Sequence, residues 1–286
     1  MNTSLNSNNL ILAGTLTVDG GTLIATNSTF DVNGGVAISS GTLTAPSGTT
    51  NATFTVAGNW SNSGGTFTAN GGKVTFDGTG QTISGSTTFY QLRKVVAAAD
   101  TLTFTASTTQ TVVNSLTLNG AAGQLLSLRS SATPTQANLI LQAGGVQTIN
   151  FVDVKDNNAS GGLLLVGHSS VNSLNNTNWS FGGAVITWTG ATSTDWDTPA
   201  NWDLGFVPTA SENVVIANTA NQPILATNVT VTSLTVNSSA NVTLNGKDFT
   251  ATGTLTNNGT ITRFGSEIAN FGTMDTACVS LIVILK

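Results

Sequence analysis

The sequence predicts an all-β protein built as a parallel β-helix, or β-solenoid, with little or no α-helix. Three observations support this prediction. Apolar and polar residues alternate with period 2 in short runs, the breaks between runs contain Gly or Asn, and similar phrases return about every 20 residues. No window carries the i, i+3, i+4 apolar stripe of an amphipathic helix. Repeated β-sandwich units are the alternative, although sandwiches usually have longer strands and tight two-residue hairpins.

The stretch from Asn51 to Gly85 shows the pattern most clearly. Its strand phrases are FTVAG, GTFTA, KVTFDG and QTISG. Alternation of period 2 marks a strand with one buried and one solvated face, so the apolar set should form a core and the intervening Thr residues should point outward. The expected core residues in this stretch are Phe54, Val56, Phe67, Val74, Phe76 and Ile83.

Similar runs fill the rest of the chain. Phrases such as NLILAG and GTLTVDG precede this stretch, and LILQAGGVQTINFVDVKDNNASGG (139–162) is the longest apolar run after it. Gly182–Gly183 has the composition of a joint. The sequence therefore predicts a first β-helix unit over residues 1–181 and a second β-solenoid unit over residues 184–286.

An internal alignment predicts the role of Trp60. Residues 249–261 align with residues 54–67, with one residue inserted near Gly65, and Leu255 then occupies the position of Trp60. An indole that exchanges with a leucine is expected in the core rather than on the surface as a sugar-binding platform.

The low content of charged residues bears on how the turns stack and on which partners are expected. Charged residues make up only 7% of the 286 residues, and the net charge is −5. Stacked parallel turns place like residues about 4.8 Å apart, where charges repel each other but Thr or Asn ladders do not. Eight Lys and Arg residues are scattered without a basic stripe, so nucleic-acid binding is not expected. We expect the Arg93–Lys94 pair at a solvated edge.

The cysteine count and the two termini carry little targeting information. A single cysteine, Cys278, excludes an intrachain disulfide and a Cys-based zinc cluster. The opening MNTSLNSNN has neither the basic nor the apolar region of a signal peptide. The terminal run ACVSLIVIL (277–285) is shorter than the about 20 residues of a membrane-spanning helix, so no membrane span is expected. We expect a truncated or altered terminus there, or a capping strand.

Two segments resemble a known class of repeat units. TWTGATSTDWDTPANWDLGFVPTASENVVI (187–216) is similar to the Trp-rich entry motif of β-helix repeat units in large bacterial extracellular, adhesin-like proteins. Residues 151–162 and 175–179 are similar to the closing motif of such units. The resemblance implies a right-handed parallel β-helix in a secreted or cell-surface protein. It also implies that the first unit is truncated at its start and the second at its end, because an entry motif and a closing motif are missing there.

The entry segment also offers a candidate metal site. Oxygen ligands from Asp195, Asp197 and Asp203 could hold Ca²⁺. The segment nevertheless lacks the alternating acidic pattern of an EF-hand loop and is interrupted by Trp and Pro. We favour a structural role, in which three Trp residues cover the end of a coil stack and an Asn ties the turn. The predicted structural residues of the two motifs are Trp188, Trp196, Asn201, Trp202, Asn178 and Trp179.

No catalytic residue and no cofactor are predicted. Asp153, Lys155 and Asp156 resemble groups that line a polysaccharide groove, but glycoside hydrolysis needs a carboxylate pair facing one cleft, and Asp156 is expected in a turn. His168 is the only histidine, and it lies outside any Gly-x-Ser-x-Gly elbow.

The sequence thus favours a non-catalytic structural or adhesive segment of a secreted bacterial surface repeat protein. Its expected partners are like repeats or other copies of itself, stacked end to end, at an extracellular or cell-surface location. The alternative is a β-helix that binds or cleaves a surface polysaccharide. Ice binding is a weaker alternative, because the Thr-x-Thr phrases fall at irregular spacing and a flat, regular array is not expected.

Overall fold

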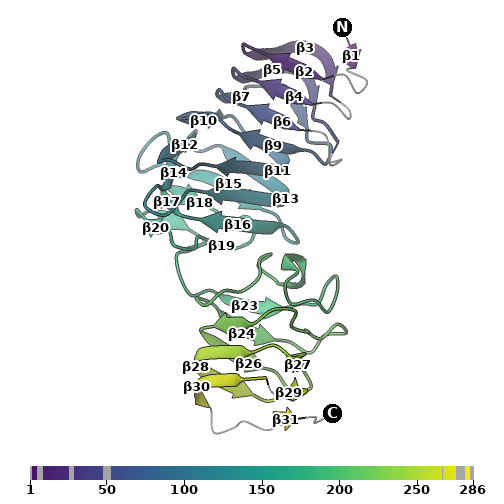
Figure 1. The fold of residues 1–286 in the computed structure, drawn as a ribbon. Coiled ribbons are helices and arrows are strands. Elements are labelled where there is room, and N and C mark those ends of the chain that lie inside the picture. Colours follow the sequence, from purple (N-terminus) through teal and green to yellow (C-terminus); the bar gives the residue numbers. More distant parts are fainter. Residues whose placement is uncertain are drawn as a thin grey trace. The chain divides into compact units, whose positions relative to one another are not determined.

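The computed structural model describes residues 2–4, 9–25, 29–47, 53–265, 267–274 and 281–283. The protein is an all-β parallel solenoid whose contacts form two compact units, Met1–Phe181 and Gly182–Lys286 (Figure 1). Within the described ranges the only helix is one turn of 3-10 helix, η1 (Pro199–Asn201). No helix in these ranges is long and apolar enough to cross a membrane.

Two parallel sheets run along the first unit. One sheet contains, in spatial order, β1 (Asn2–Ser4), β3 (Leu16–Ile24), β5 (Val36–Thr44), β7 (Trp60–Asn62), β10 (Gln81–Ser84), β12 (Asp100–Phe104), β14 (Leu126–Ser130), β17 (Val152–Lys155) and β20 (Val171–Asn172), with β8 (Thr66–Thr68) beside β5. The other contains β2 (Leu10–Leu12), β4 (Phe30–Val32), β6 (Phe54–Val56), β9 (Lys73–Phe76), β11 (Thr87–Val95), β13 (Thr109–Asn119), β15 (Ala137–Leu141), β18 (Asn157–Asn158) and β21 (Asn176–Thr177), with β16 (Val146–Asn150) beside β13. A short third pair joins β19 (Leu165–Val166) to β22 (Trp179–Ser180).

The second unit repeats this arrangement with fewer turns. Its larger sheet contains, in order, β23 (Val185–Trp188), β24 (Asn213–Ile216), β26 (Ser233–Val236), β28 (Phe249–Asn257) and β25 (Val229–Val231), with β30 (Ala269–Met274) beside β28. Its smaller sheet contains β27 (Asn241–Thr243), β29 (Thr260–Arg263) and β31 (Leu281–Val283). Apart from β31, the terminal run ACVSLIVIL lies outside the described residues.

Strand register confirms the predicted architecture. Leu16 pairs in parallel with Val36, and Val214 pairs in parallel with Leu234, 20 residues later in each case. The predicted parallel β-solenoid and its turn of about 20 residues are therefore confirmed. The alternative of β-sandwich repeats is wrong, because the strands of a sandwich pair antiparallel.

Inward side chains form columns that continue from turn to turn. Val36, Trp60, Ile83 and Phe104 occupy paired positions on β5, β7, β10 and β12, and all four side chains are buried. Trp60 is buried as predicted, and its indole Nε1 donates a hydrogen bond to Thr87 Oγ1 at 3.1 Å. A buried indole needs such a partner because an unpaired N–H in the core costs about 1–3 kcal/mol.

Phe67 departs from the predicted core. The other five apolar residues predicted for this stretch are buried, whereas Phe67 is only partly buried. Its ring lies at the margin of the core and meets Trp60 edge-on, with 4.8 Å between ring centroids. Phe67 lies on β8, which pairs with β5 alone in the described sheets, so one edge of β8 has no hydrogen-bonded neighbouring strand.

Outward threonines are more regular in space than in sequence. Thr22, Thr42 and Thr66 occupy paired positions on β3, β5 and β8, and Thr44 and Thr68 form a second column beside them. The offsets along the chain differ, 20 residues from Thr22 to Thr42 and 24 from Thr42 to Thr66, because the intervening loops differ in length. Short threonine columns therefore form even where the Thr-x-Thr phrases are unequally spaced in the sequence.

Two glycines beside β10 provide a matched test of stacking. Gly80 and Gly85 both have positive φ, 60° and 74°. A Cβ at Gly85 would lie 1.7 Å from the carbonyl oxygen of Asn62 in the preceding turn, whereas a Cβ at Gly80 would meet nothing within 4 Å. Gly80→Ala should cost about 1–2 kcal/mol, the strain of a left-handed alanine.

We expect Gly85→Ala to lower the free energy of unfolding clearly more than Gly80→Ala does, because the same backbone cost is joined by a clash between turns. Urea unfolding of the full chain, followed by circular dichroism, measures both variants. Equal losses would show that the turns can separate locally without disturbing the stack.

Candidate functional site

Three tryptophans form the apolar interior of the first turn of the second unit. Trp188 is the last residue of β23, and Trp196 and Trp202 lie in the loop that follows; all three are buried. The ring of Trp202 meets Trp188 edge-on at 5.0 Å and Trp196 at 4.7 Å, and Trp196 also meets Phe249 at 5.9 Å. The indoles are thus packed against one another and against the core rather than displayed to a ligand.

Asn201 organises the loop that carries these indoles. Its Oδ1 accepts hydrogen bonds from the Thr192 amide (2.9 Å), the Thr192 hydroxyl (2.8 Å) and the Ser193 amide (3.0 Å). Its Nδ2 donates to Ser193 Oγ (2.9 Å) and to the carbonyl oxygen of Asp195 (2.8 Å). The Asn201 side chain is fully buried, so its amide bonds to the loop and not to water. An amide offers two donors and one acceptor oxygen, and all are used here.

The three candidate calcium ligands do not come together. The Asp195 carboxylate accepts from the Asp197 amide (3.1 Å) and the Thr198 hydroxyl (2.8 Å), and Asp203 accepts from the Thr187 amide (2.8 Å). Among the residues that the structure describes, no group of three or more His, Cys, Asp or Glu side chains is placed to hold a metal ion. Asp197 accepts from the Thr227 hydroxyl (3.1 Å), so each of the three carboxylates has hydrogen-bond partners of its own within the fold.

The segment that was predicted to close the first unit uses its side chains in the same way. Asn178 has a left-handed backbone, φ 59°, and its Nδ2 donates to the carbonyl oxygen of Ala159 at 3.0 Å. Trp179 donates from Nε1 to Asn157 Oδ1 at 2.9 Å, and its ring stacks on Phe181 with 5.8 Å between centroids. These contacts tie the last turn of the unit to the turn before it.

Asp153 and Lys155 lie on the outward face of β17, whereas Asp156 does not share that face. Asp153 is paired with the guanidinium of Arg129 on the neighbouring strand β14. Asp156 has a left-handed backbone, φ 59°, and its side chain is buried. A hydrogen bond from Asn175 lowers the pKa of Asp156 more than burial raises it. As predicted, Asp156 leaves the strand and enters a turn.

Lys94 contradicts the prediction of a solvated edge. The side chain is fully buried, and Nζ donates to the Gly78 carbonyl oxygen (2.8 Å) and to Gln81 Oε1 (2.9 Å). Nζ also pairs with Asp100 Oδ2 at 2.8 Å. The register of β11 shifts between Phe89 and Gln91, and after that shift Lys94 lies on the inward face. Lys94 follows the buried Leu92 by two residues, so strand alternation alone would have placed both side chains on the same inward face.

The neighbours of Lys94 are themselves fixed by the main chain. Gln81 is buried, and its Nε2 donates to the carbonyl oxygens of Val56 (2.8 Å) and Gly58 (2.7 Å) in the preceding turn. Asp100 Oδ1 accepts from the amides of Gly80 (2.8 Å) and Thr101 (2.7 Å). We call Lys94, Gln81 and Asp100 the Lys94 triad.

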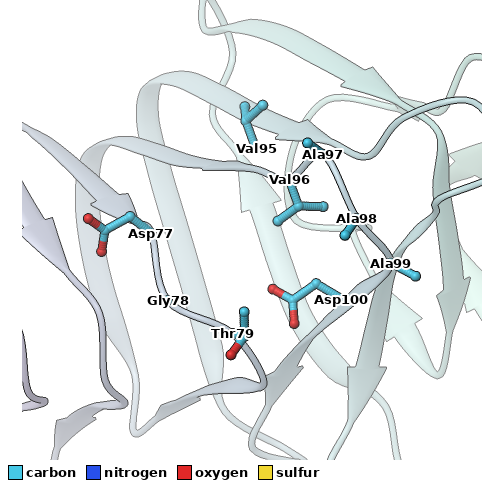
Figure 2. A pocket seen from close by; sticks show the side chains of 9 residues that line it. All are labelled: Asp77, Gly78, Thr79, Val95, Val96, Ala97, Ala98, Ala99 and Asp100. Carbon is cyan, nitrogen blue, oxygen red and sulfur yellow. The ribbon is translucent and has the colours of Figure 1, made fainter.

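A small pocket of about 290 Å³ lies beside the triad, lined by residues 77–79 and 95–100. In Figure 2 the Asp100 side chain points into this hollow between Val96 and Thr79, whereas the Asp77 carboxylate points away from it. Ligand pockets typically measure about 300–1,000 Å³, so this one is at the lower limit for an organic ligand. It is large enough for a few small molecules the size of water or ammonia.

Burial and hydrogen bonding act oppositely on the two carboxyls of the pocket. Burial alone would raise the pKa of Asp100, but hydrogen bonds from Lys94 and from the amides of Gly80 and Thr101 outweigh it and lower that pKa. The pKa of Asp77 is raised, chiefly by burial and also by repulsion from Asp31. Asp100 is therefore held in its ionised form as the partner of Lys94.

A family model for a domain of unknown function, DUF8693, matches residues 187–267. The match begins within β23, includes the whole Trp-rich loop and ends at Glu267. It covers 81 of the 286 residues, so it identifies a domain within the chain and does not assign the whole chain to a family. No curated protein and no solved structure matches the chain.

Replacement of Asn201 by Ala should destabilise the second unit by about 1–3 kcal/mol, because it removes the hydrogen bonds by which a fully buried amide holds the loop over residues 192–195. Chemical denaturation followed by tryptophan fluorescence measures the loss. Asn237→Ala is the matched control, since Asn237 is exposed and lies in the same unit. A loss no larger than that of the control would contradict the role assigned to Asn201.

Acid should destabilise the first unit through Asp100 and Asp156, whose pKa values are lowered in the folded state. Their contribution is fully present above the unfolded pKa of about 3.9 and is lost as the pH falls through the lower folded values. We expect the urea concentration at the unfolding midpoint of the first unit to decrease as the pH is lowered from 5 towards the folded pKa values. This decrease should be smaller in Asp100→Asn, which lacks one of the two carboxyls.

At neutral pH the same Asp100→Asn variant should lose about 3–5 kcal/mol, because Lys94 is left buried without its counter-ion. Asp19→Asn, which changes an exposed carboxylate of β3, is the control and should behave as the wild type. A pH profile of Asp100→Asn that matches the wild type would exclude Asp100 as a source of acid sensitivity.

Proposed function

We propose that this chain is a non-catalytic structural or adhesive segment of a bacterial extracellular, cell-surface repeat protein. The observation that carries the proposal is the role of the polar side chains at the two motifs. Asn201 and Asn178 use their amides to hold the main chain, and the Trp residues of the entry segment are buried in the turn they close. Groups engaged in this way support a scaffold. The resemblance of residues 187–216 to entry motifs of surface repeats supports the location.

The proposed partners are like repeats or other copies of this chain. The last strand of the first sheet, β20, pairs with β17, and an outer strand edge has main-chain groups that can accept a further strand. Val171 on β20 and Leu174 just after it are exposed apolar side chains, Leu174 with 72% of its surface accessible. The low charge of the chain provides little repulsion between copies. Neither calcium, nucleic acid nor a membrane span enters the proposal.

Binding of a surface polysaccharide is the second candidate. It is favoured by Arg129 on β14 and by Asp153 and Lys155 on β17, because these residues bring charge to one outward face of adjacent turns. Cleavage of the polysaccharide would in addition require two carboxyl groups facing one groove. The contacts of Asp153 with Arg129 and of Asp156 with Asn175 give that version less support.

Sedimentation velocity of the full chain at increasing concentration tests self-association. We expect the sedimentation coefficient to rise with concentration, and Leu174→Asp to weaken this rise several-fold, because a charge replaces an apolar contact. Ile11→Asp is the matched control, since Ile11 is equally apolar and 66% exposed but lies on the outward face of β2. A chain that stays monomeric throughout would contradict the proposed partner.

A glycan array separates the second candidate from the first. Binding of acidic polysaccharides that is lost in Lys155→Ala, in a chain that does not self-associate, would favour polysaccharide binding. Absence of any glycan signal, together with self-association, would favour the scaffold.

A further inference from the structure

The Lys94 triad contains the three groups that formation of an internal amide bond requires. Lys94 supplies an amine, Asp100 supplies a carboxylate 2.8 Å from Nζ, and Gln81 supplies an amide whose Oε1 lies 2.9 Å from Nζ. All three side chains are withdrawn from solvent, with Lys94 0%, Gln81 1% and the Asp100 side chain 7% exposed. We propose that Lys94 and Gln81 condense into an intramolecular amide cross-link between β11 and β10.

The step balances without any further reactant. The Asp100 carboxylate takes a proton from the Lys94 ammonium, which frees the lone pair on Nζ. Nζ attacks Cδ of Gln81, and the resulting tetrahedral centre collapses as the bond from Cδ to Nε2 breaks. As the centre collapses, the second proton of Nζ passes to the departing nitrogen, which leaves as ammonia. Asp100 then gives the proton it took from Lys94 to the ammonia, so that the products are the amide, an ammonium ion and the original Asp100 carboxylate. One Nζ–Cδ bond has replaced one Cδ–Nε2 bond, and no oxidant or reductant is involved.

The surroundings orient the electrophile. Gln81 Nε2 is held by the carbonyl oxygens of Val56 and Gly58, and Oε1 accepts from Lys94 Nζ at 2.9 Å, so the amine contacts the oxygen bonded to Cδ of the amide. Fixing the reacting groups in contact raises their effective concentration by orders of magnitude, which compensates for the poor reactivity of an amide. The core around the triad also keeps water from competing with the amine.

The pocket beside the triad is the space into which ammonia would pass once it has left Gln81, which does not itself line the pocket. Gly78, whose carbonyl oxygen accepts from Lys94, and Asp100 both line it, and it opens between residues 77–79 and 95–100 (Figure 2). The reacting groups are therefore buried but next to a solvent-connected space. The cross-link would close a segment of 14 residues, from Gln81 to Lys94, in a chain whose single cysteine, Cys278, cannot form an internal disulfide.

An internal amide also gives a reason for a lysine placed where leucine or valine would fit. A buried ion pair is often no more stabilising than apolar side chains of the same volume, so the ion pair by itself gives little reason to keep a charge there. Formation of the amide would remove the Lys94 charge from the core. It would also restrict the unfolded chain, as a disulfide does for a loop of this length.

The intact mass of the purified full chain tests the proposal directly. After incubation of the folded protein, the mass should be lower than the sequence mass by one ammonia molecule. Trypsin should then release residues 74–93 covalently joined to a peptide that begins at Lys94. A wild-type mass equal to the sequence mass would overturn the proposal. A deficit of one water molecule mapped to Lys94 and Asp100 would overturn the assignment of Gln81.

Two variants test the roles of Lys94 and Asp100 in the cross-link, and a third serves as the control. Lys94→Met should retain the full sequence mass, and a deficit that persists in it would overturn the proposal. Asp100→Asn, checked for folding by circular dichroism, should form the cross-link at least tenfold more slowly; an unchanged rate would exclude Asp100 as the base. Gln110→Met is the matched control, because Gln110 is also buried but donates to the Gly85 carbonyl oxygen, and it should keep the deficit.

Discussion

Each strand of the solenoid obtains its main-chain hydrogen bonds from the equivalent strand one turn away, so register between turns is the constraint on which the structure depends. In a parallel ladder a shift of one residue would exchange the inward and outward sets of side chains. Column continuity keeps the register: Val36, Trp60, Ile83 and Phe104 stack in one line of the core. Loops of different length are tolerated because they lie outside these columns.

The same constraint determines which polar groups can enter the interior. A charged side chain in an inward column lies between the side chains of the turns above and below it. It is therefore shielded from water and needs hydrogen-bonding partners from the neighbouring turns. Lys94 has them because Gln81 and the carbonyl of Gly78 lie beside it and Asp100 supplies a counter-ion. In the same way, the buried indole N–H of Trp60 has a hydrogen-bond acceptor, Thr87 Oγ1, on another strand.

The two units differ from a simple stack mainly at their motifs. The entry segment has one large loop, which Asn201 and the three Trp residues convert from exposed chain into a packed turn. The closing segment has left-handed residues at Asp156 and Asn178, where the chain leaves the ladder. The side chains of both segments hold the main chain, and this is the observation on which the proposed scaffold function rests.

The sequence by itself determined the strand periodicity, the turn length and the burial of Trp60, because these follow from local alternation and from self-similarity between residues 54–67 and 249–261. Only the tertiary structure decided the place of Lys94, since a register shift within β11 decides which face it occupies. It also aligned the outward threonines of β3, β5 and β8, whose spacing in the sequence is unequal. Alternation is a local property, whereas register is a relation between turns and depends on every loop between them.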